Sequence, residues 1–167
     1  HNAKLALKSK RTGEDVSRLA MDCGRFDAQK VLRGETSAVS AAMSRAMAQA
    51  ESEAGHSGDL RMAELLLDRA CYEEMSALAS ETGSTFLKDY VALQIDAVNL
   101  RTLVRARRMG CEDDVFAAAM LPGGHIPAGQ LKGARGDHLS SLTHGTPLDS
   151  AGELAAKLLD SGGGLTE

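Results

Sequence analysis

The chain has 167 residues, of which 43% are hydrophobic and only 3% are aromatic, and it contains no tryptophan. Alanine, leucine, valine and methionine therefore supply the apolar content, which favours close helix packing over a β-sandwich, whose strands are rich in β-branched and aromatic residues. The formal net charge of −4 argues against general attraction to nucleic-acid phosphates or anionic lipid headgroups. No apolar run approaches the length of a membrane span, so any membrane role is expected to be peripheral, without insertion. Three widely spaced cysteines (Cys23, Cys71 and Cys111) fit reduced thiols in a cytosolic compartment.

Glycines divide the first third of the chain into helical segments. Residues 1–12 are expected to form the end of a helix that stops at Gly13, and residues 14–22 a short helix. A helix rich in alanine and methionine is expected over residues 36–54, with Thr36 or Ser37 as its N-cap. Because the sequence starts inside helical sequence and without methionine, we expect it to be a piece of a longer chain.

The longest predicted helix covers residues 84–109 and follows a helix predicted over residues 59–80. Its apolar residues form one stripe at helical spacing, and a second set widens this stripe beyond what a surface helix needs. We therefore expect this helix to pack on two sides. The first set is Phe86, Tyr90, Leu93, Ala97, Leu100 and Val104, and the second is Leu87, Val91, Ile95 and Val98.

Short helical segments complete the chain. They are expected over residues 112–121 and 150–159, with a turn at residues 122–124 and a glycine-rich end at residues 162–164. No stretch shows a convincing strand pattern. We therefore predict an all-α fold built around long helices.

An internal repeat relates the start of the chain to the end of the longest helix. Residues 1–13, HNAKLALKSKRTG, align with residues 98–110, VNLRTLVRARRMG, at an offset of 97. The match resumes at an offset of 100, where residues 24–28 face residues 124–128. The aligned pairs include Asn2 with Asn99, Lys4 with Arg101, Lys8 with Arg105, Lys10 with Arg107, Arg11 with Arg108, and Gly13 with Gly110.

Two collinear blocks separated by a small insertion indicate duplicated helical domains, since the period is too long for a solenoid. We assign residues 1–34 to the C-terminal part of a first helical repeat and residues 35–135 to a second. Residues 136–167 begin a further helical segment with the glycine-rich end. The alignment also predicts an aspartate three residues before Asn2 in a longer chain, matching Asp96.

The stretch IDAVNLRTLVRARRMG (residues 95–110) admits four interpretations. Catalysis by Asp96 needs a second acid or base on the same face, and the helix offers only Asp89, one heptad earlier, and no histidine. A metal site needs ligand spacing that the five histidines lack.

A nucleic-acid helix is the third interpretation, because Arg101, Arg105 and Arg108 share one face. However, the chain is acidic and lacks interleaved aromatic residues. In the fourth interpretation the cations stabilise the negative end of the helix dipole, while Asp96 and Asn99 form interhelical hydrogen bonds or ion pairs that fix the packing register. We therefore predict no catalytic, cofactor-binding or metal-binding residue. The predicted structural or interaction residues of the repeat are Asp96, Asn99, Arg101, Arg105, Arg108, Asn2, Lys4 and Lys8.

These motifs resemble a known family. FLKDYVALQIDAVNLRTLVRARRMG, preceded by LLLDRACYEEMSALA and followed by an LPGG turn, is similar to the C subunit of the V/A-type rotary ATPases, which corresponds to the d subunit of the eukaryotic vacuolar enzymes. The resemblance is strongest over residues 63–124 and weak after Lys132. One departure is Cys71-Tyr72, where the family more usually has an aromatic pair.

The resemblance implies a three-domain, funnel-shaped, all-helical protein, of which this chain supplies the tail of one domain and most of the next. It implies a non-catalytic rotor subunit without cofactors, on the cytoplasmic face of the membrane. Such a protein links the central-stalk subunits D and F to the proteolipid c/K ring and transmits torque during ATP synthesis or hydrolysis coupled to H⁺ or Na⁺ transport. Arg101, Arg105 and Arg108 are candidates for the stalk contact. The alternative is a stand-alone helical protein–protein interaction module unrelated to ion transport, and an enzyme is the third hypothesis.

Overall fold

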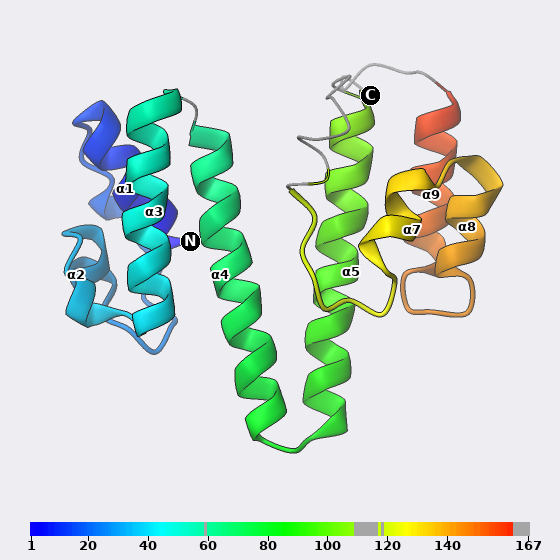
Figure 1. The fold of residues 1–167 in the computed structure, drawn as a ribbon, viewed down its shortest axis with the longest axis horizontal. Coiled ribbons are helices and arrows are strands. Elements are labelled where there is room, and N and C mark those ends of the chain that lie inside the picture. The colour runs from blue at the N-terminus through cyan, green and yellow to red at the C-terminus, as the bar shows by residue number, and fades with distance from the viewer. Residues whose placement is uncertain (59, 109–116, 118, 162–167) are drawn as a thin grey trace. The chain divides into compact units, whose positions relative to one another are not determined.

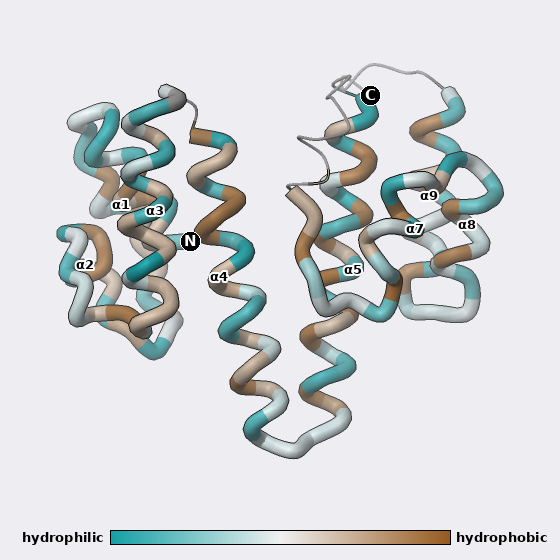
Figure 2. Tube along the Cα trace, viewed as in Figure 1, coloured by the Kyte–Doolittle hydropathy of each residue, from teal (hydrophilic) through white to brown (hydrophobic). Residues whose placement is uncertain are grey.

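The computed structural model describes residues 1–58, 60–108, 117 and 119–161, and every regular element in these residues is a helix. The prediction of an all-α fold is therefore confirmed. The chain divides into two compact units, His1–Glu74 and Met75–Glu167. Figure 2 shows polar and apolar residues interspersed along each helix. None of the described helices is long and apolar enough to cross a membrane.

The first unit consists of short elements packed around two longer helices (Figure 1). Its elements are α1 (Asn2–Thr12), η1 (Ser17–Leu19), α2 (Ala28–Leu32), η2 (Thr36–Ala38), α3 (Ala41–Ser57) and the first part of α4 (Leu60–Glu81). Gly13 ends α1 with a φ of 73°, a left-handed conformation that glycine adopts without steric cost. Asp27 caps α2 by accepting from the Lys30 backbone N–H, and this hydrogen bond holds the pKa of the Asp27 carboxyl below its usual value.

Two expectations for this unit are wrong. Only Ser17–Leu19 is helical in the segment predicted as a helix over residues 14–22. Thr36 and Ser37 do not cap α3, because they lie in η2, and Val39 then takes an extended conformation. The cap is Ser40, whose Oγ accepts from the Met43 backbone N–H at 3.1 Å. All three residues are good N-caps, and the separate turn of η2 decides which one is used.

The core of the first unit is formed by small and medium apolar side chains. Alanines at the contacts allow α1, α3 and α4 to approach closely, and Leu7, Met47 and Leu67 fill the remaining space. The buried members of this cluster are Ala6, Leu7, Ala46, Met47, Ala50, Ala54, Ala63 and Leu67.

The second unit is organised around α5 (Thr85–Arg108). Three shorter helices follow, namely α7 (Ala128–Gly133), α8 (Gly136–Thr143) and α9 (Asp149–Asp160), and both α7 and α9 contact α5. Their buried residues form a second cluster with Leu100 and Leu103 of α5. The predicted bounds of α5 and α9 agree with the structure to within a residue, whereas the helix expected over residues 112–121 falls largely outside the described residues.

Packing of α5 on two sides is correct only for its later turns. Ile95 and Leu103 are fully buried, but Phe86 is 74% exposed and Tyr90 is 49% exposed. The core cluster that α5 shares with α7, α8 and α9 includes Leu100 and Leu103 of α5 but neither of these aromatic residues. The apolar side chains at the start of α5 therefore remain on the surface.

Candidate functional site

Asp96 and Asn99 lie one turn apart on α5 and face the same side of the helix. Both are buried, with exposed fractions of 2% and 0%. A buried polar side chain is costly unless its hydrogen bonds are made, so their partners determine what this pair can do.

Asn99 binds the backbone of Leu121 through both ends of its amide. Its Nδ2 donates to the Leu121 carbonyl oxygen at 2.9 Å, and its Oδ1 accepts from the Leu121 N–H at 2.8 Å. This side chain therefore holds the loop that precedes α7 through a pair of backbone hydrogen bonds.

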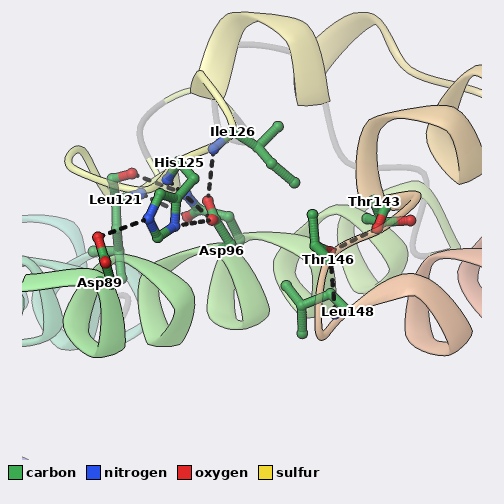
Figure 3. A network of polar contacts seen from close by, with 9 residues as sticks. Asp89, Asp96, Leu121, His125, Ile126, Thr143, Thr146 and Leu148 are labelled. Carbon is green, nitrogen blue, oxygen red and sulfur yellow. Dashed lines mark hydrogen bonds and ion pairs between the residues drawn. The ribbon is translucent and has the colours of Figure 1, made fainter. Parts of the chain in front are cut away.

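Asp96 binds the same loop slightly further along the chain (Figure 3). Its Oδ2 accepts from the His125 N–H at 3.0 Å, and its Oδ1 accepts from the Ile126 N–H at 3.1 Å. The His125 ring lies between two carboxylates, with Nδ1 3.4 Å from Asp96 Oδ2 and Nε2 3.4 Å from Asp89 Oδ1. We call Asp96, Asn99 and the backbone groups that they bind the loop clamp.

Gly124 lies between the two halves of the loop clamp, and its lack of a side chain is required there. A Cβ at this position would lie 2.0 Å from Asp96 Oδ1 and 3.3 Å from Ile95 Cγ2. The LPGG turn predicted from the sequence therefore permits the close approach of the loop to the Asp96 carboxylate.

The first unit contains the amide half of the same arrangement. Asn2 Nδ2 donates to the Met21 carbonyl oxygen at 2.8 Å, and Asn2 Oδ1 accepts from the Met21 N–H at 2.9 Å. Asn2 corresponds to Asn99 at the first offset of the sequence repeat, and Met21 corresponds to Leu121 at the second. The repeated sequence thus makes the same pair of hydrogen bonds twice, which supports the duplication.

The predicted cations have different surroundings in the two units. In the first unit, Lys4 Nζ lies 2.6 Å from Asp68 Oδ2 and Lys8 Nζ lies 2.8 Å from Glu64 Oε1, so both pair with α4. In the second, Arg101 and Arg105 are exposed, and neither forms an ion pair within the part of the chain that the structure describes. Arg108 is half-buried.

Arg107 has a structural contact that the sequence interpretation did not single out. Its guanidinium donates to the Lys132 carbonyl oxygen at 2.8 Å and ties the end of α5 to α7. In the sequence repeat Arg107 aligns with Lys10, whose Nζ forms an ion pair with Glu51 at 2.6 Å. The alignment therefore gave no indication that Arg107 binds a backbone carbonyl.

A cavity of about 500 Å³ lies beside the loop clamp in the second unit. Phe86, Tyr90 and Leu93 of α5 line one side, and residues 145–148 line another. Thr146 shapes that second wall, because its Oγ1 donates to the Thr143 carbonyl oxygen at 2.6 Å and accepts from the Leu148 N–H at 3.1 Å (Figure 3). The cavity is mostly apolar, with Asp89, Asp96 and His125 at its polar edge.

Asp96 and Asn99 both direct their side chains at loop backbone. Both Asp96 oxygens already accept backbone hydrogen bonds, which leaves this carboxylate poorly placed to take a proton from a substrate. Among the residues that the structure describes, no group of three or more His, Cys, Asp or Glu side chains could hold a metal ion.

Comparison with known proteins matches residues 1–161 to a family described as ATP synthase (C/AC39) subunit. The chain is 29% identical over 128 residues to the C subunit of the V-type ATP synthase of Thermus thermophilus, equally in two strains of that organism. The alignment covers 70% of this chain and 38% of each relative, so the chain spans well under half of their length. A search of solved structures gave no significant match.

Proposed function

Because the chain belongs to the ATP synthase (C/AC39) subunit family, we propose that it is part of the non-catalytic central-axis subunit of a V/A-type rotary ATPase. The family match confirms the resemblance to the C subunit that the sequence motifs indicated. In this proposal the protein links the central-stalk subunits D and F to the proteolipid c/K ring on the cytoplasmic face of the membrane. It transmits torque while other parts of the enzyme carry out ATP chemistry and H⁺ or Na⁺ translocation.

The observation that carries the proposal is the loop clamp. A protein that transmits torque must deform little under load. Hydrogen bonds from buried side chains of a helix to the backbone of a loop restrict the motion of that loop relative to the helix. Four such bonds join α5 to its loop, and two join α1 to the matching loop. The buried polar side chains of α5 therefore make the attachment of the loop to the helix stiff.

A non-catalytic role is supported by the same contacts. Asp96 is fully engaged by backbone donors, and Asp89, the other carboxylate at the cavity, is 73% exposed. Asp96 has both oxygens occupied by backbone N–H donors, and Asp89 is largely in solvent, so neither carboxylate is set up to exchange a proton with a substrate.

Co-purification tests the proposal. The full-length protein, co-expressed with subunits D and F, should elute with them on size exclusion and should also bind membranes that contain the proteolipid ring. Failure to bind either partner would overturn it.

Coupling is tested in the assembled enzyme. The double variant Asp96→Asn, Asn99→Ala should assemble but pump fewer ions for each ATP hydrolysed, because the clamped loop becomes compliant. Arg45→Ala, at an exposed position of α3, is the matched control and should leave the coupling ratio unchanged.

The alternative, a stand-alone helical interaction module, is favoured by one observation, the exposed Phe86 and Tyr90 at the start of α5. Exposed aromatic side chains beside an apolar cavity are typical of protein-binding surfaces. Under this alternative the neighbouring genes encode no ATPase subunits, and the protein co-purifies with partners other than D, F and the ring.

A further inference from the structure

The helices α1 and α5, which the sequence repeat aligns, contact corresponding helices in their two units, except that α1 has one further partner among the described residues. In the first unit α1 contacts α2 and α3, and in the second unit α5 contacts α7 and α9. The order of these elements along the chain is the same, so α7 corresponds to α2 and α9 to α3. In the first unit α4 also packs on α1, and it follows α3 after Gly58. The element that would follow α9 in the same way lies outside the described residues.

The contact between α1 and α4 has a defined charge pattern. Lys4 and Lys8 are four residues apart on α1, and their partners Asp68 and Glu64 are four residues apart on α4. The earlier lysine pairs with the later acid, so the two helices run antiparallel. Each pair is part-exposed and contributes modestly to stability, but together they fix the register of the two helices.

In the second unit, the matching cations have no acidic partner among the residues that the structure describes. Arg101 and Arg105 correspond to Lys4 and Lys8, are exposed, and form no ion pair within the described residues. The apolar residue between the two cations is also less buried in the second unit than in the first. Leu7 is buried in the first unit, whereas its counterpart Val104 is only partly buried.

We propose that Arg101 and Arg105 form the docking surface for an acidic helix of the same protein, downstream of α9, that runs antiparallel to α5. This helix carries two carboxylates four residues apart, the first pairing with Arg105 and the second with Arg101. The relatives are longer than the aligned stretch, which covers 38% of their length. Arginine suits this role because its planar guanidinium binds a carboxylate through two parallel hydrogen bonds. The inference rests on the repeat and does not depend on the proposed function.

Zero-length cross-linking tests the proposal in the full-length protein. Arg101→Lys and Arg105→Lys each place a primary amine at the docking surface, and a carbodiimide joins an amine to a carboxylate that it contacts. Peptide mass spectrometry should find each introduced amine coupled to one of two acids downstream of α9, spaced by four residues and in antiparallel order. The Lys4–Asp68 and Lys8–Glu64 pairs serve as internal positive controls.

Arg45→Lys is the matched negative control, because Arg45 is an exposed α3 arginine without an ion pair to any described residue. It should give no unique coupled partner. Coupling of positions 101 and 105 to residues 112–114 of this chain, or to a stalk protein in the assembled enzyme, would overturn the proposal. So would the absence of coupling at these positions when the Lys4 and Lys8 products form.

Charge reversal gives an independent readout. Arg101→Glu with Arg105→Glu should lower the thermal unfolding midpoint of the full-length protein. Changing both coupled acids to lysine should restore it. If the reversed arginines leave the midpoint unchanged, the docking surface is not used.

Discussion

Asp96 is a buried carboxylate whose hydrogen bonds come mainly from the backbone. The desolvation cost of such a group is offset when N–H donors converge on its charged form. His125 and Ile126 supply those donors, and the His125 ring adds a third contact that reaches solvent. The charge of Asp96 is thus used to hold a loop.

Replacing Asp96 with asparagine keeps the shape of the side chain but removes one charged acceptor. One of the two loop N–H groups then faces an amide nitrogen, so we expect a loss of about 2 kcal/mol in the free energy of unfolding. Urea titration measures this loss. Asp89→Asn, at an exposed position of the same helix, is the control and should change stability by less than about 0.5 kcal/mol. Equal effects of the two changes would contradict the clamp.

A methyl group at Gly124 should displace the loop, since its Cβ would lie 2.0 Å from Asp96 Oδ1. We expect Gly124→Ala to cost about 3 kcal/mol by urea titration. Gly24→Ala is the matched change, because Gly24 aligns with Gly124 but its Cβ would meet nothing within 4 Å. It should be nearly neutral in the 167-residue chain. A similar loss at both glycines in this chain would show that the clash is not the cause.

At the scale of residues, the sequence predicted that Asp96 and Asn99 are polar packing groups, because no catalytic or metal-binding partner accompanied them. Their partners were expected on another helix, yet the structure places them on loop backbone. Backbone groups leave no trace in residue identity. The usable signal was the glycine at position 124, where the loop approaches Asp96 so closely that a Cβ would not fit.

At the scale of elements, the loop before α2 lacks the carboxylate half of the arrangement seen after α5. Arg25 and Phe26 correspond to His125 and Ile126, and neither of their N–H groups donates to a described residue. A Cβ on Gly24 would meet nothing within 4 Å, whereas a Cβ on the aligned Gly124 would clash with the Asp96 carboxylate. The aspartate expected three residues before Asn2 would bind these two N–H groups.

Extending the chain tests this expectation. The tripeptide Ile-Asp-Ala placed before His1 reproduces the sequence around Asp96, and Ile-Asn-Ala is the control. The aspartate version should unfold at a higher temperature and slow hydrogen exchange at Arg25 and Phe26, and Gly24→Ala should then become costly. Identical melting and exchange of the two versions would refute the expectation.

Long elements were easier to predict than short ones. The start of α5 follows from the glycine before it, Gly83, and its length follows from a sustained apolar period. The start of α3 was misplaced because Thr36, Ser37 and Ser40 are equally good caps in sequence, and η2, a tertiary feature, chooses among them. The exposed first turns of α5 show the converse, since an apolar period alone does not say whether a partner covers it.

At the scale of the whole molecule, the described residues contain two separate apolar cores. Leu7 belongs to the first and Leu139 to the second, and the two clusters have no described residue in common. We expect Leu7→Ala and Leu139→Ala each to cost about 3 kcal/mol and to accelerate hydrogen exchange within their own unit. Loss of protection in both units from either change would show that they unfold as one.

The division into units does not follow the repeat. The boundary between the units falls within α4, whereas the repeat assigns α3, α4 and α5 to one copy. In the first unit, residues assigned to the first predicted repeat therefore pack on residues assigned to the second. A sequence repeat is recognised by matching residues, whereas a compact unit is defined by the helix faces that bury apolar surface against one another.

The loop clamp also has a mechanical consequence. Its four hydrogen bonds attach adjacent turns of α5 to one short loop, so a pull on that loop along the helix axis stretches them together. Bonds loaded in parallel share the force and rupture only as a group, whereas bonds loaded in series open one at a time. The segment from Leu121 to Ile126 should therefore resist shear far better than its lack of secondary structure suggests.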